Sequence, residues 1–354
     1  MNPRLRLRSA RSYTWKSQHS QVSYHFTRRE WVEVNHAGDW EWLTSGAGVT
    51  FDEDPVLGER LLGRDVAARF DSGEAKRLLV CRGRGLGDVL LLIPALREWQ
   101  RRYPESTVGV AVDRGYRRFL SGVAHHTLDY EEAYELAPWD VVANLNYYAE
   151  RSSQDTVAHR SVVFGQGLGL DNVGDLKLEC AALPEMRKRA REMLEGVPRP
   201  WLALQTEAST PTRCPPPTKM IELADALSGL GSVVALGGGV CVPPGVRDWQ
   251  DLRDVELVAG VLSEADVVVG LDSGLTHLGN ALGTKCVALF GPGDPGLRVG
   301  GQPRCLPVPL WGYGLCESPC RDHRPPTCLQ RPRCLIRFPV EVVVEAVRGQ
   351  LCRQ

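Results

Sequence analysis

Short apolar runs alternate with segments of helical pattern from residue 76 to the C-terminus. The runs have the length and the β-branched content of buried parallel strands. They occupy residues 78–81, 108–112, 141–145, 201–204, 233–236, 266–269 and 286–290. Helical patterns occupy residues 185–194, 220–230, 255–262 and 340–351. This alternation predicts α/β structure, with parallel sheets that helices cover on both faces.

Two of the expected strands run into glycine-rich turns. The strand at 78–81 is followed by Arg82-Gly83-Arg84-Gly85-Leu86-Gly87-Asp88 and then by a helical pattern at 89–99. Pro94 lies inside that pattern, so we expect a kink or a late helix start there. The strand at 266–269 leads into residues 270–283, where Asp272 or Ser273 can cap a short helix that Gly283 ends.

A helix that starts at the carboxyl end of a parallel strand presents free backbone N–H groups and the positive end of its dipole. Both features suit a phosphate group. The turn at 270–283 therefore indicates a phosphate site. An ordinary β-α-β unit without a ligand explains the same residues, and at this point both interpretations stay open.

Residues 1–75 follow a different pattern. Alternating segments at 12–15, 22–26 and 31–34 predict half-exposed strands, and 40–43 is the expected hairpin partner of 31–34. The tryptophans of this region could form a stacking platform, but we favour the core of a small β module. These are Trp15, Trp31, Trp40 and Trp42. The basic arm at 4–11 and the acidic run Asp52-Glu53-Asp54 are expected to be solvated.

Length and composition fit a globular protein of two domains, with 354 residues, 43% hydrophobic and 24% charged. The net charge of −1 gives no signal for nucleic acid. No apolar run is long enough to span a bilayer, and no secretory signal is evident, so we expect a cytoplasmic protein. Peripheral contact with a membrane stays open. The odd number of cysteines, 11, argues against a disulfide framework.

The two glycine-rich turns also carry a family resemblance. Residues 87–97 with Arg101-Arg102-Tyr103-Pro104 resemble the N-terminal signature of glycosyltransferase family 9, the ADP-heptose:lipopolysaccharide heptosyltransferases. Residues 272–278 and 281–284 resemble its C-terminal signature. The resemblance covers residue 76 onwards and implies GT-B architecture, with two Rossmann-like, doubly wound domains that face a cleft.

From the resemblance and the patterns we predict four regions. They are a small β-rich extension at 1–75, an acceptor domain at 76–197, a nucleotide-sugar donor domain at 198–338 and a C-terminal helix at 339–354, which in such enzymes often crosses back to the first domain. The stiff segment Val197-Pro198-Arg199-Pro200 marks the boundary between the two large domains.

The resemblance implies an inverting, metal-independent glycosyltransferase that needs no cofactor. Its donor would be a nucleotide-diphosphate sugar, most simply an ADP-sugar, and its acceptor a hydroxyl of a glycan, a glycolipid or another molecule. Asp88 is the predicted general base, with a helix cap as the structural alternative. The expected donor-binding residues are Ser209, Thr210, Arg213, Gly238, Asp272, Ser273, Gly274, Leu275, Thr276 and His277. The expected acceptor-side residues are Arg84, Gly87, Asn144 and Asn146.

Three positions depart from the family pattern. Ser273 stands where Thr is more common, Arg213-Cys214-Pro215 lacks the usual Trp, and Val240 stands where an acidic residue is common. The last two departures bear on the donor's base or sugar and leave the phosphate-binding logic intact.

Cysteines gather in a Pro- and Arg-rich loop near the C-terminus. Four thiolates can hold a structural zinc ion, although these spacings contain no tight Cys-x-x-Cys pair. The candidates are Cys316, Cys320, Cys328 and Cys334. Two other functions stay open: a nucleotide-sugar epimerase of the same layout, for which His277 is the only candidate acid or base, and a non-catalytic scaffold that binds nucleotide sugars.

Overall fold

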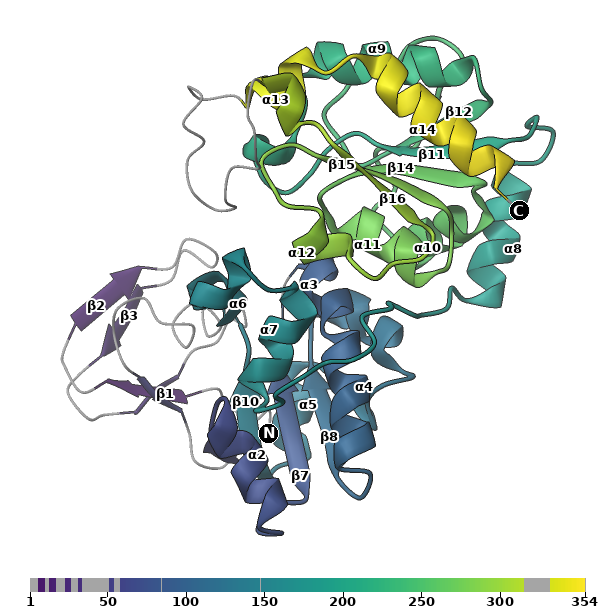
Figure 1. Ribbon diagram of the computed structural model, residues 1–354. Helices are drawn as coiled ribbons and strands as arrows, with labels where there is room; N and C mark the ends of the chain where they lie inside the picture. Colours follow the sequence, from purple (N-terminus) through teal and green to yellow (C-terminus); the bar gives the residue numbers. More distant parts are fainter. Residues whose placement is uncertain are drawn as a thin grey trace. The chain divides into compact units, whose positions relative to one another are not determined.

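The computed structural model describes residues 6–9, 13–16, 23–26, 31–33, 51–53, 58–83, 85–146, 148–314 and 332–353. The chain forms two compact units. The first consists of Met1–Arg84, Ala95–Ser152 and Ser161–Gly174, and the second of Gly85–Pro94, Ser153–Arg160 and Asp175–Gln354. Each unit is built on its own sheet (Figure 1).

The N-terminal region contains five short strands. They are β1 (Arg6–Ser9), β2 (Tyr13–Lys16), β3 (Ser23–Phe26), β4 (Trp31–Glu33) and β5 (Phe51–Glu53). β2 pairs with β3, and β1 lies between β4 and β5, all antiparallel. The strands expected near 12–15, 22–26 and 31–34 are confirmed, and the one at 40–43 lies outside the described residues.

The basic arm and the acidic run each contain a short strand, β1 and β5. That their side chains are solvated stays a prediction. Arg8 of β1 is in register with Asp52 of β5, and Leu7 with Glu53. The arm alternates as Leu5-Arg6-Leu7-Arg8, which is the two-residue period of a strand. The backbones of β1 and β5 therefore form an antiparallel pair.

The first α/β sheet has the strand order β6-β10-β7-β8-β9, and all its pairs are parallel. Its strands are β6 (Gly58–Arg60), β7 (Arg77–Cys81), β8 (Thr107–Ala111), β9 (His126–Leu128) and β10 (Trp139–Asn144). Its helical segments are α2 (Arg64–Asp71), α4 (Ile93–Arg102), η1 (Arg114–Leu120), α5 (Tyr130–Glu135), α6 (Tyr148–Arg151) and α7 (Arg160–Gly167).

This sheet begins earlier in the chain than the boundary expected at 75/76. β6 pairs with β10, and α2 packs on α4 through Phe70 and Trp99, whose ring centroids lie 4.9 Å apart. Phe70 and Trp99 are both buried. The three-residue strand β6 has no apolar run, so the hydrophobic pattern gave no sign of it.

The second sheet has the strand order β13-β12-β11-β14-β15-β16 and is also parallel throughout. Its strands are β11 (Trp201–Gln205), β12 (Ser232–Leu236), β13 (Arg247–Asp248), β14 (Val267–Leu271), β15 (Cys286–Phe290) and β16 (Cys305–Pro309). Its helical segments are α8 (Pro184–Met193), η3 (Pro211–Arg213), α9 (Pro217–Ser228), α10 (Val255–Glu264), α11 (Gly274–Ala281), α12 (Gly296–Val299), η4 (Trp311–Gly314), α13 (Arg333–Arg337) and α14 (Val340–Cys352).

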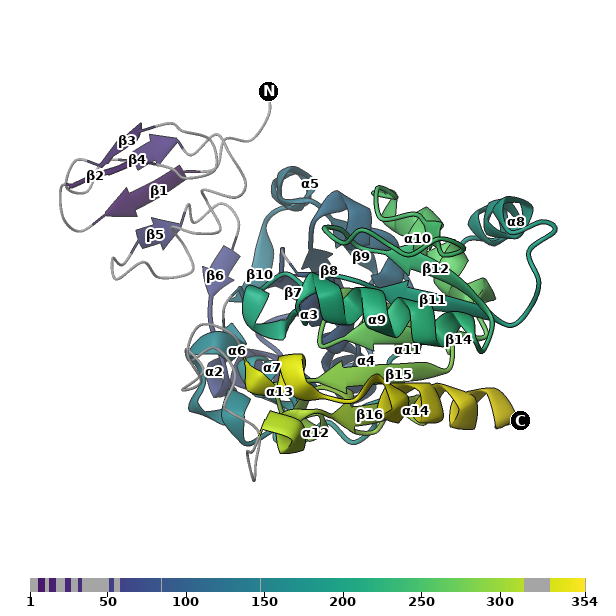
Figure 2. The same cartoon turned by 90° about the horizontal axis from the view of Figure 1, so that it is seen from above.

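Helices cover both faces of the second sheet. α9 and α14 lie on one face, and α10 and α11 on the other (Figures 1 and 2). Every residue of β14 and β15 is buried between them. This double cover explains why both strands are continuous apolar runs.

The second unit begins before the boundary expected at 197/198. α8 packs on α10, because Gly260 leaves room for the carbonyl of Met186 and Glu264 accepts hydrogen bonds from Arg187 and Arg191 at 2.7 and 2.8 Å. The stiff Pro-rich segment therefore lies inside this unit. The C-terminal helix belongs to it too, and Gln350 of α14 donates to the carbonyl of Cys286 at 3.1 Å.

The helical pattern after β7 is broken where Pro94 predicts a break. α3 (Leu86–Leu91) ends one residue before α4, whose second residue is Pro94. By its contacts α3 belongs to the second unit, although β7 belongs to the first. Among the described residues, no helix is both long and apolar enough to cross a bilayer.

Candidate functional site

The second sheet reverses its direction of growth between β11 and β14. β12 and β13 follow β11 on one side, and β15 and β16 follow β14 on the other. The loops after β11 and β14 therefore diverge, and such a switch point is where doubly wound sheets bind ligands. The two loops contain most of the predicted donor-binding residues, at 206–213 and 272–277.

Arg213 joins the two loops. Its Nε donates to Thr210 Oγ1 at 2.8 Å and its Nη2 to Ser209 Oγ at 2.9 Å. Its Nη1 donates to the carbonyl of Asp272 at 2.7 Å. A guanidinium has five N–H donors, and one fifth of this side chain remains exposed. Arg213 thus holds a positive charge between the loops after β11 and β14.

The turn between β14 and α11 has the form expected of an anion site. Ser273 precedes α11 in extended conformation, and its side chain makes no capping bond to the helix. Instead Ser273 Oγ accepts from Gln205 Nε2, while Gln205 Oε1 accepts from the amide of Leu271 at 3.3 Å. The first N–H groups of α11 are therefore not satisfied by this cap. Gln205 was missed from sequence, although a polar residue ending an apolar strand was the available signal.

The Thr276 hydroxyl points into the turn between β14 and α11. It donates to the carbonyl of Leu271 at 2.5 Å, and the residue is only 1% exposed. Gly270 opposite gives it room, since a β-carbon there would lie 2.0 Å from Thr276 Oγ1. The Thr276 hydroxyl therefore closes the turn from inside and does not face a ligand.

Gly238 lies in the loop after β12, at the same edge of the sheet. Its neighbours Gly237 and Gly239 have positive φ angles of 109° and 76°, so this turn needs glycine. A β-carbon on Gly238 would lie 2.7 Å from Glu207 Oε2. Glu207 thus stands between the loops after β11 and β12, and sequence reasoning gave it no role.

Asp88 lies beside the turn between β14 and α11. α3 packs against α11 at two glycines: a β-carbon on Gly87 would lie 3.5 Å from the Cα of Gly274. Asp88 is the third residue of α3, and Gly85 precedes the helix, so Asp88 is not its N-cap. Its Oδ1 accepts from Arg160 Nη1 at 2.6 Å. The predicted acceptor-side residue Gly87 is thus a packing contact of α11.

His277 is buried beneath Asp88. It is 3% exposed, and its Nδ1 has no hydrogen-bond partner among the described residues. Burial lowers the pKa of His277 to about 3, and the opposing attraction of the Asp88 carboxylate is smaller. A neutral, buried imidazole is a poor acid or base for a substrate, which weakens the epimerase alternative.

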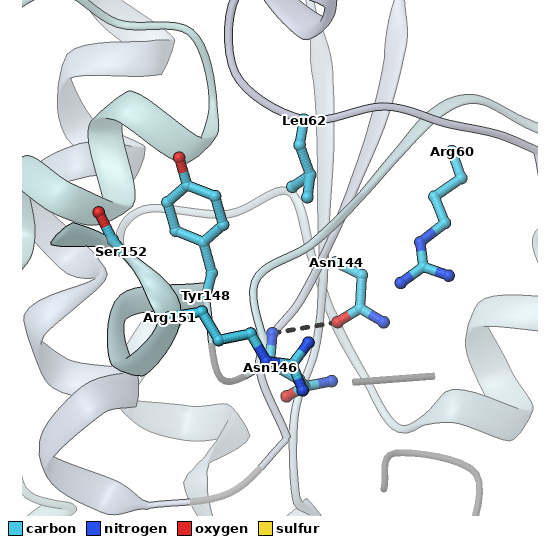
Figure 3. A pocket seen from close by; sticks show the side chains of 7 residues that line it. All are labelled: Arg60, Leu62, Asn144, Asn146, Tyr148, Arg151 and Ser152. Atoms are coloured by element: carbon cyan, nitrogen blue, oxygen red, sulfur yellow. Dashed lines mark hydrogen bonds between the residues drawn. The ribbon is translucent and has the colours of Figure 1, made fainter. Parts of the chain in front are cut away.

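The first sheet has its own switch point between β7 and β10. Asn146 Oδ1 accepts from the amide of Gly83 at 2.9 Å, and Asn144 Oδ1 accepts from the amide of Asn146 at 3.0 Å. Beside them lies a cavity of about 200 Å³, shown in Figure 3. It is lined by Arg60, Leu62, Asn144, Asn146, Tyr148, Arg151 and Ser152. Burial raises the pKa of Tyr148, which keeps its hydroxyl neutral. Arg84 lies outside the described residues.

The predicted zinc site cannot be followed in full. Cys334 is the second residue of α13 and is buried, whereas Cys316, Cys320 and Cys328 lie outside the described residues. Within the described part of the chain, no three His, Cys, Asp or Glu side chains are grouped as metal ligands.

Comparison with known proteins bears on this site. The family model "Glycosyltransferase family 9 (heptosyltransferase)" matches residues 254–303, which contain the whole β14–α11 turn. Lipopolysaccharide heptosyltransferase 1 of Escherichia coli K12 is 39% identical over 70 residues. That match spans 20% of this chain and 18% of the curated relative. The predicted resemblance to glycosyltransferase family 9 is confirmed.

Solved structures agree on the fold. A family 9 glycosyltransferase of Veillonella parvula DSM 2008 has 17% identity and a TM-score of 0.61, over 78% of this chain and 97% of that one. TibC of enterotoxigenic E. coli H10407, an iron-containing dodecameric glycosyltransferase, has 16% identity and a TM-score of 0.58, over 99% and 92%. TibC has also been solved with ADP-D-β-D-heptose. The predicted GT-B class, with two Rossmann-like domains, is confirmed.

Proposed function

We propose that this family 9-like chain is a glycosyltransferase that moves a heptose or related sugar from a nucleotide-diphosphate donor to an acceptor hydroxyl. The observation that carries the proposal is the family match over 254–303, because it contains the turn that starts α11 at the switch point of the second sheet. ADP-heptose is the proposed donor, in line with the ADP-D-β-D-heptose bound to TibC.

The donor's diphosphate would lie against the start of α11. The N–H groups of Ser273, Gly274 and Leu275 and the dipole of the helix favour negative charge there. Arg213 adds a fixed guanidinium from the neighbouring loop. These groups stabilise the charge that develops on the diphosphate as the bond from the sugar carbon to the phosphate oxygen breaks, so we propose transfer without a catalytic metal.

Asp88 is the proposed general base. It takes the proton of the acceptor hydroxyl as the acceptor oxygen bonds to the sugar carbon and ADP leaves with the electron pair of the broken bond. A single displacement of this kind inverts the configuration at that carbon. The close packing of Gly87 on Gly274 supports this role, since it brings Asp88 next to the turn that would hold the donor.

The acceptor would bind at the switch point of the first sheet. Asn144, Asn146 and Tyr148 offer amide and hydroxyl groups to a sugar, and Arg60 and Arg151 add positive charge. We propose a glycan or glycolipid acceptor, in line with the lipopolysaccharide named for the E. coli relative. A cytoplasmic location and peripheral contact with a membrane stay predictions.

The metal content of the cysteine loop is a separate proposal. We keep structural zinc as the candidate for Cys316, Cys320, Cys328 and Cys334, and the iron of TibC adds a second metal to be tested. Elemental analysis of the purified chain for zinc and iron distinguishes the two, and absence of both contradicts a metal-binding loop.

One experiment separates the enzyme from the scaffold. ADP release from ADP-heptose is followed with lipopolysaccharide-core acceptors, and ADP binding is measured by calorimetry. Asp88→Asn should lower turnover by about a hundredfold to ten-thousandfold, as a lost general base does, with ADP affinity nearly unchanged. Tight ADP binding by the parent without turnover on any acceptor would favour the scaffold.

A further inference from the structure

Four charged side chains form a buried chain that ends at Asp88. Arg160 donates from Nη1 to Asp88 Oδ1 at 2.6 Å. The same guanidinium donates two hydrogen bonds to Asp155, from Nε to Oδ1 at 3.0 Å and from Nη2 to Oδ2 at 3.1 Å. Arg298 Nη2 in turn donates to Asp155 Oδ2 at 3.4 Å. The side chains of Arg160, Asp155 and Arg298 are 5–6% exposed, and that of Asp88 is 16% exposed.

These residues come from three distant segments that lie together in the second unit. Asp88 is on α3, Arg298 is on α12, Arg160 begins α7, and Asp155 lies in η2 (Ser153–Thr156) just before it. His277 interacts electrostatically with Asp88, Arg298, His159 and Arg160. Burial lowers the pKa of His277 and that of His159, so neither competes for Asp88 as a cation near neutral pH.

Buried ion pairs contribute little net free energy to the stability of a folded protein. Desolvation of the charges offsets much of their attraction, and apolar residues of similar size often do as well. A function in fixing geometry is therefore the better explanation. The two bonds to Asp155 use one edge of the Arg160 guanidinium and set its plane. Nη1 is then the nitrogen that meets Asp88.

We propose that Arg160 is a positioning residue for Asp88, itself held in place by Asp155 and, through Asp155, by Arg298. The proposal rests on the proposed role of Asp88 as general base. Arg160 fixes one carboxylate oxygen of Asp88 through a hydrogen bond of 2.6 Å. The effect of Arg160 on the reaction is therefore indirect, through the position of Asp88.

A double-mutant cycle tests this proposal with ADP-heptose and a lipopolysaccharide-core acceptor. Arg160→Gln should lower kcat by about tenfold to hundredfold, the cost of a small misplacement of a reacting group, with the KM for the donor changed by less than about threefold. In the Asp88→Asn background the same change should cost almost nothing, because residues that act as one unit are not additive. Asp155→Asn should behave in the same way.

Controls keep a folding defect apart from a positioning role. Arg191→Gln removes an ion pair to Glu264 from the same unit, and its kcat should stay at the parent value. ADP affinity and melting temperature are measured for every variant. Arg160→Lys keeps the positive charge but cannot form both hydrogen bonds to Asp155. If Arg160→Gln fails to fold, Arg160→Lys replaces it, and its kcat should be lower than that of the parent.

Two results overturn the proposal. One is a kcat of Arg160→Gln equal to that of the parent, and the other is a loss that multiplies fully with that of Asp88→Asn. Either can occur while Asp88→Asn alone abolishes turnover, in which case the proposed function stands without its positioning residue. Full turnover of Asp88→Asn instead removes the base itself, and with it both proposals for Asp88.

Discussion

The amide nitrogen of Gly87 lies 3.2 Å from the position that a β-carbon on Gly274 would take. The same β-carbon would meet the Cβ of Leu86 at 3.0 Å. Both distances are tight, and the first involves backbone. The approach of α3 to α11 therefore depends on glycine at 274, and so does the place of Asp88 beside the turn between β14 and α11.

Gly274→Ala should push α3 away from α11. We expect a loss of about 1–3 kcal/mol in the free energy of unfolding, as in other overpacked contacts, with turnover lost beyond what stability explains. Gly349→Ala is the matched control, because nothing lies within 4 Å of its β-carbon and it sits inside α14. It should gain about 0.5–1 kcal/mol in stability with turnover unchanged. Normal stability and turnover in Gly274→Ala would show that the contact is loose.

Arg213→Gln should weaken diphosphate binding selectively. A hydrogen bond to a charged group contributes about 1.5–3 kcal/mol, so calorimetry should find ADP bound about tenfold to a hundredfold more weakly. Adenosine, which has no phosphate, should bind as before. Arg199→Gln is the control, since Arg199 pairs with Asp266 near the other end of β11. An equal loss for ADP and adenosine would indicate that Arg213 only shapes the loops.

His277 should make the protein less stable in acid. Burial lowers its pKa from 6.5 to about 3, so the unfolded chain binds the proton more readily than the folded one. The free energy of unfolding should therefore be fully present above pH 6.5 and fall as the pH drops towards 3, with a slope of at most about 1.4 kcal/mol per pH unit from this residue. His159, with a pKa of about 4, adds to the same trend.

Urea titrations between pH 7 and pH 4 measure this slope. His277→Phe removes the titrating group, so its stability should depend less steeply on pH than that of the parent. His159→Asn should flatten the curve over a narrower range. Parallel curves for the parent and His277→Phe would mean that folding does not lower the pKa of His277.

Seven strands of the two sheets could be predicted from the sequence because each is an apolar run: β7, β8, β10, β11, β12, β14 and β15. The strands β6, β9, β13 and β16 were missed. β14 and β15 are buried on both faces, which leaves no polar residue to blur the pattern. The short strands β1, β5 and β6 have only three or four residues and charged neighbours. Their place comes from pairing with strands far along the chain, which a local pattern does not encode.

Some residues of the candidate site could also be predicted from the sequence, and others could not. Asp88, Arg213 and Ser273 follow strands, so topology alone brings them to the ends of sheets. Arg160 and Asp155 could not be found, because no motif marks them and their bonds reach far along the chain: Arg160 bonds Asp88, 72 residues away, and Asp155 bonds Arg298, 143 residues away. The direction of the Thr276 hydroxyl could not be predicted, because a hydroxyl at a helix start has two uses, and only the carbonyl of Leu271 decides between them.

The assignment of residues 85–94 and 153–160 to the second unit limits how this chain can be recombined with its relatives. Consider a hybrid that joins the first 174 residues of one relative to the remainder of another. Its Asp88 and Arg160 would come from the first relative, and its turn between β14 and α11 from the second. The contact between Gly87 and Gly274 would then join residues from two different proteins, and so would the ion pair between Asp155 and Arg298. Exchange of donor specificity between relatives therefore has to carry the loops after β7 and α6 along with the C-terminal half.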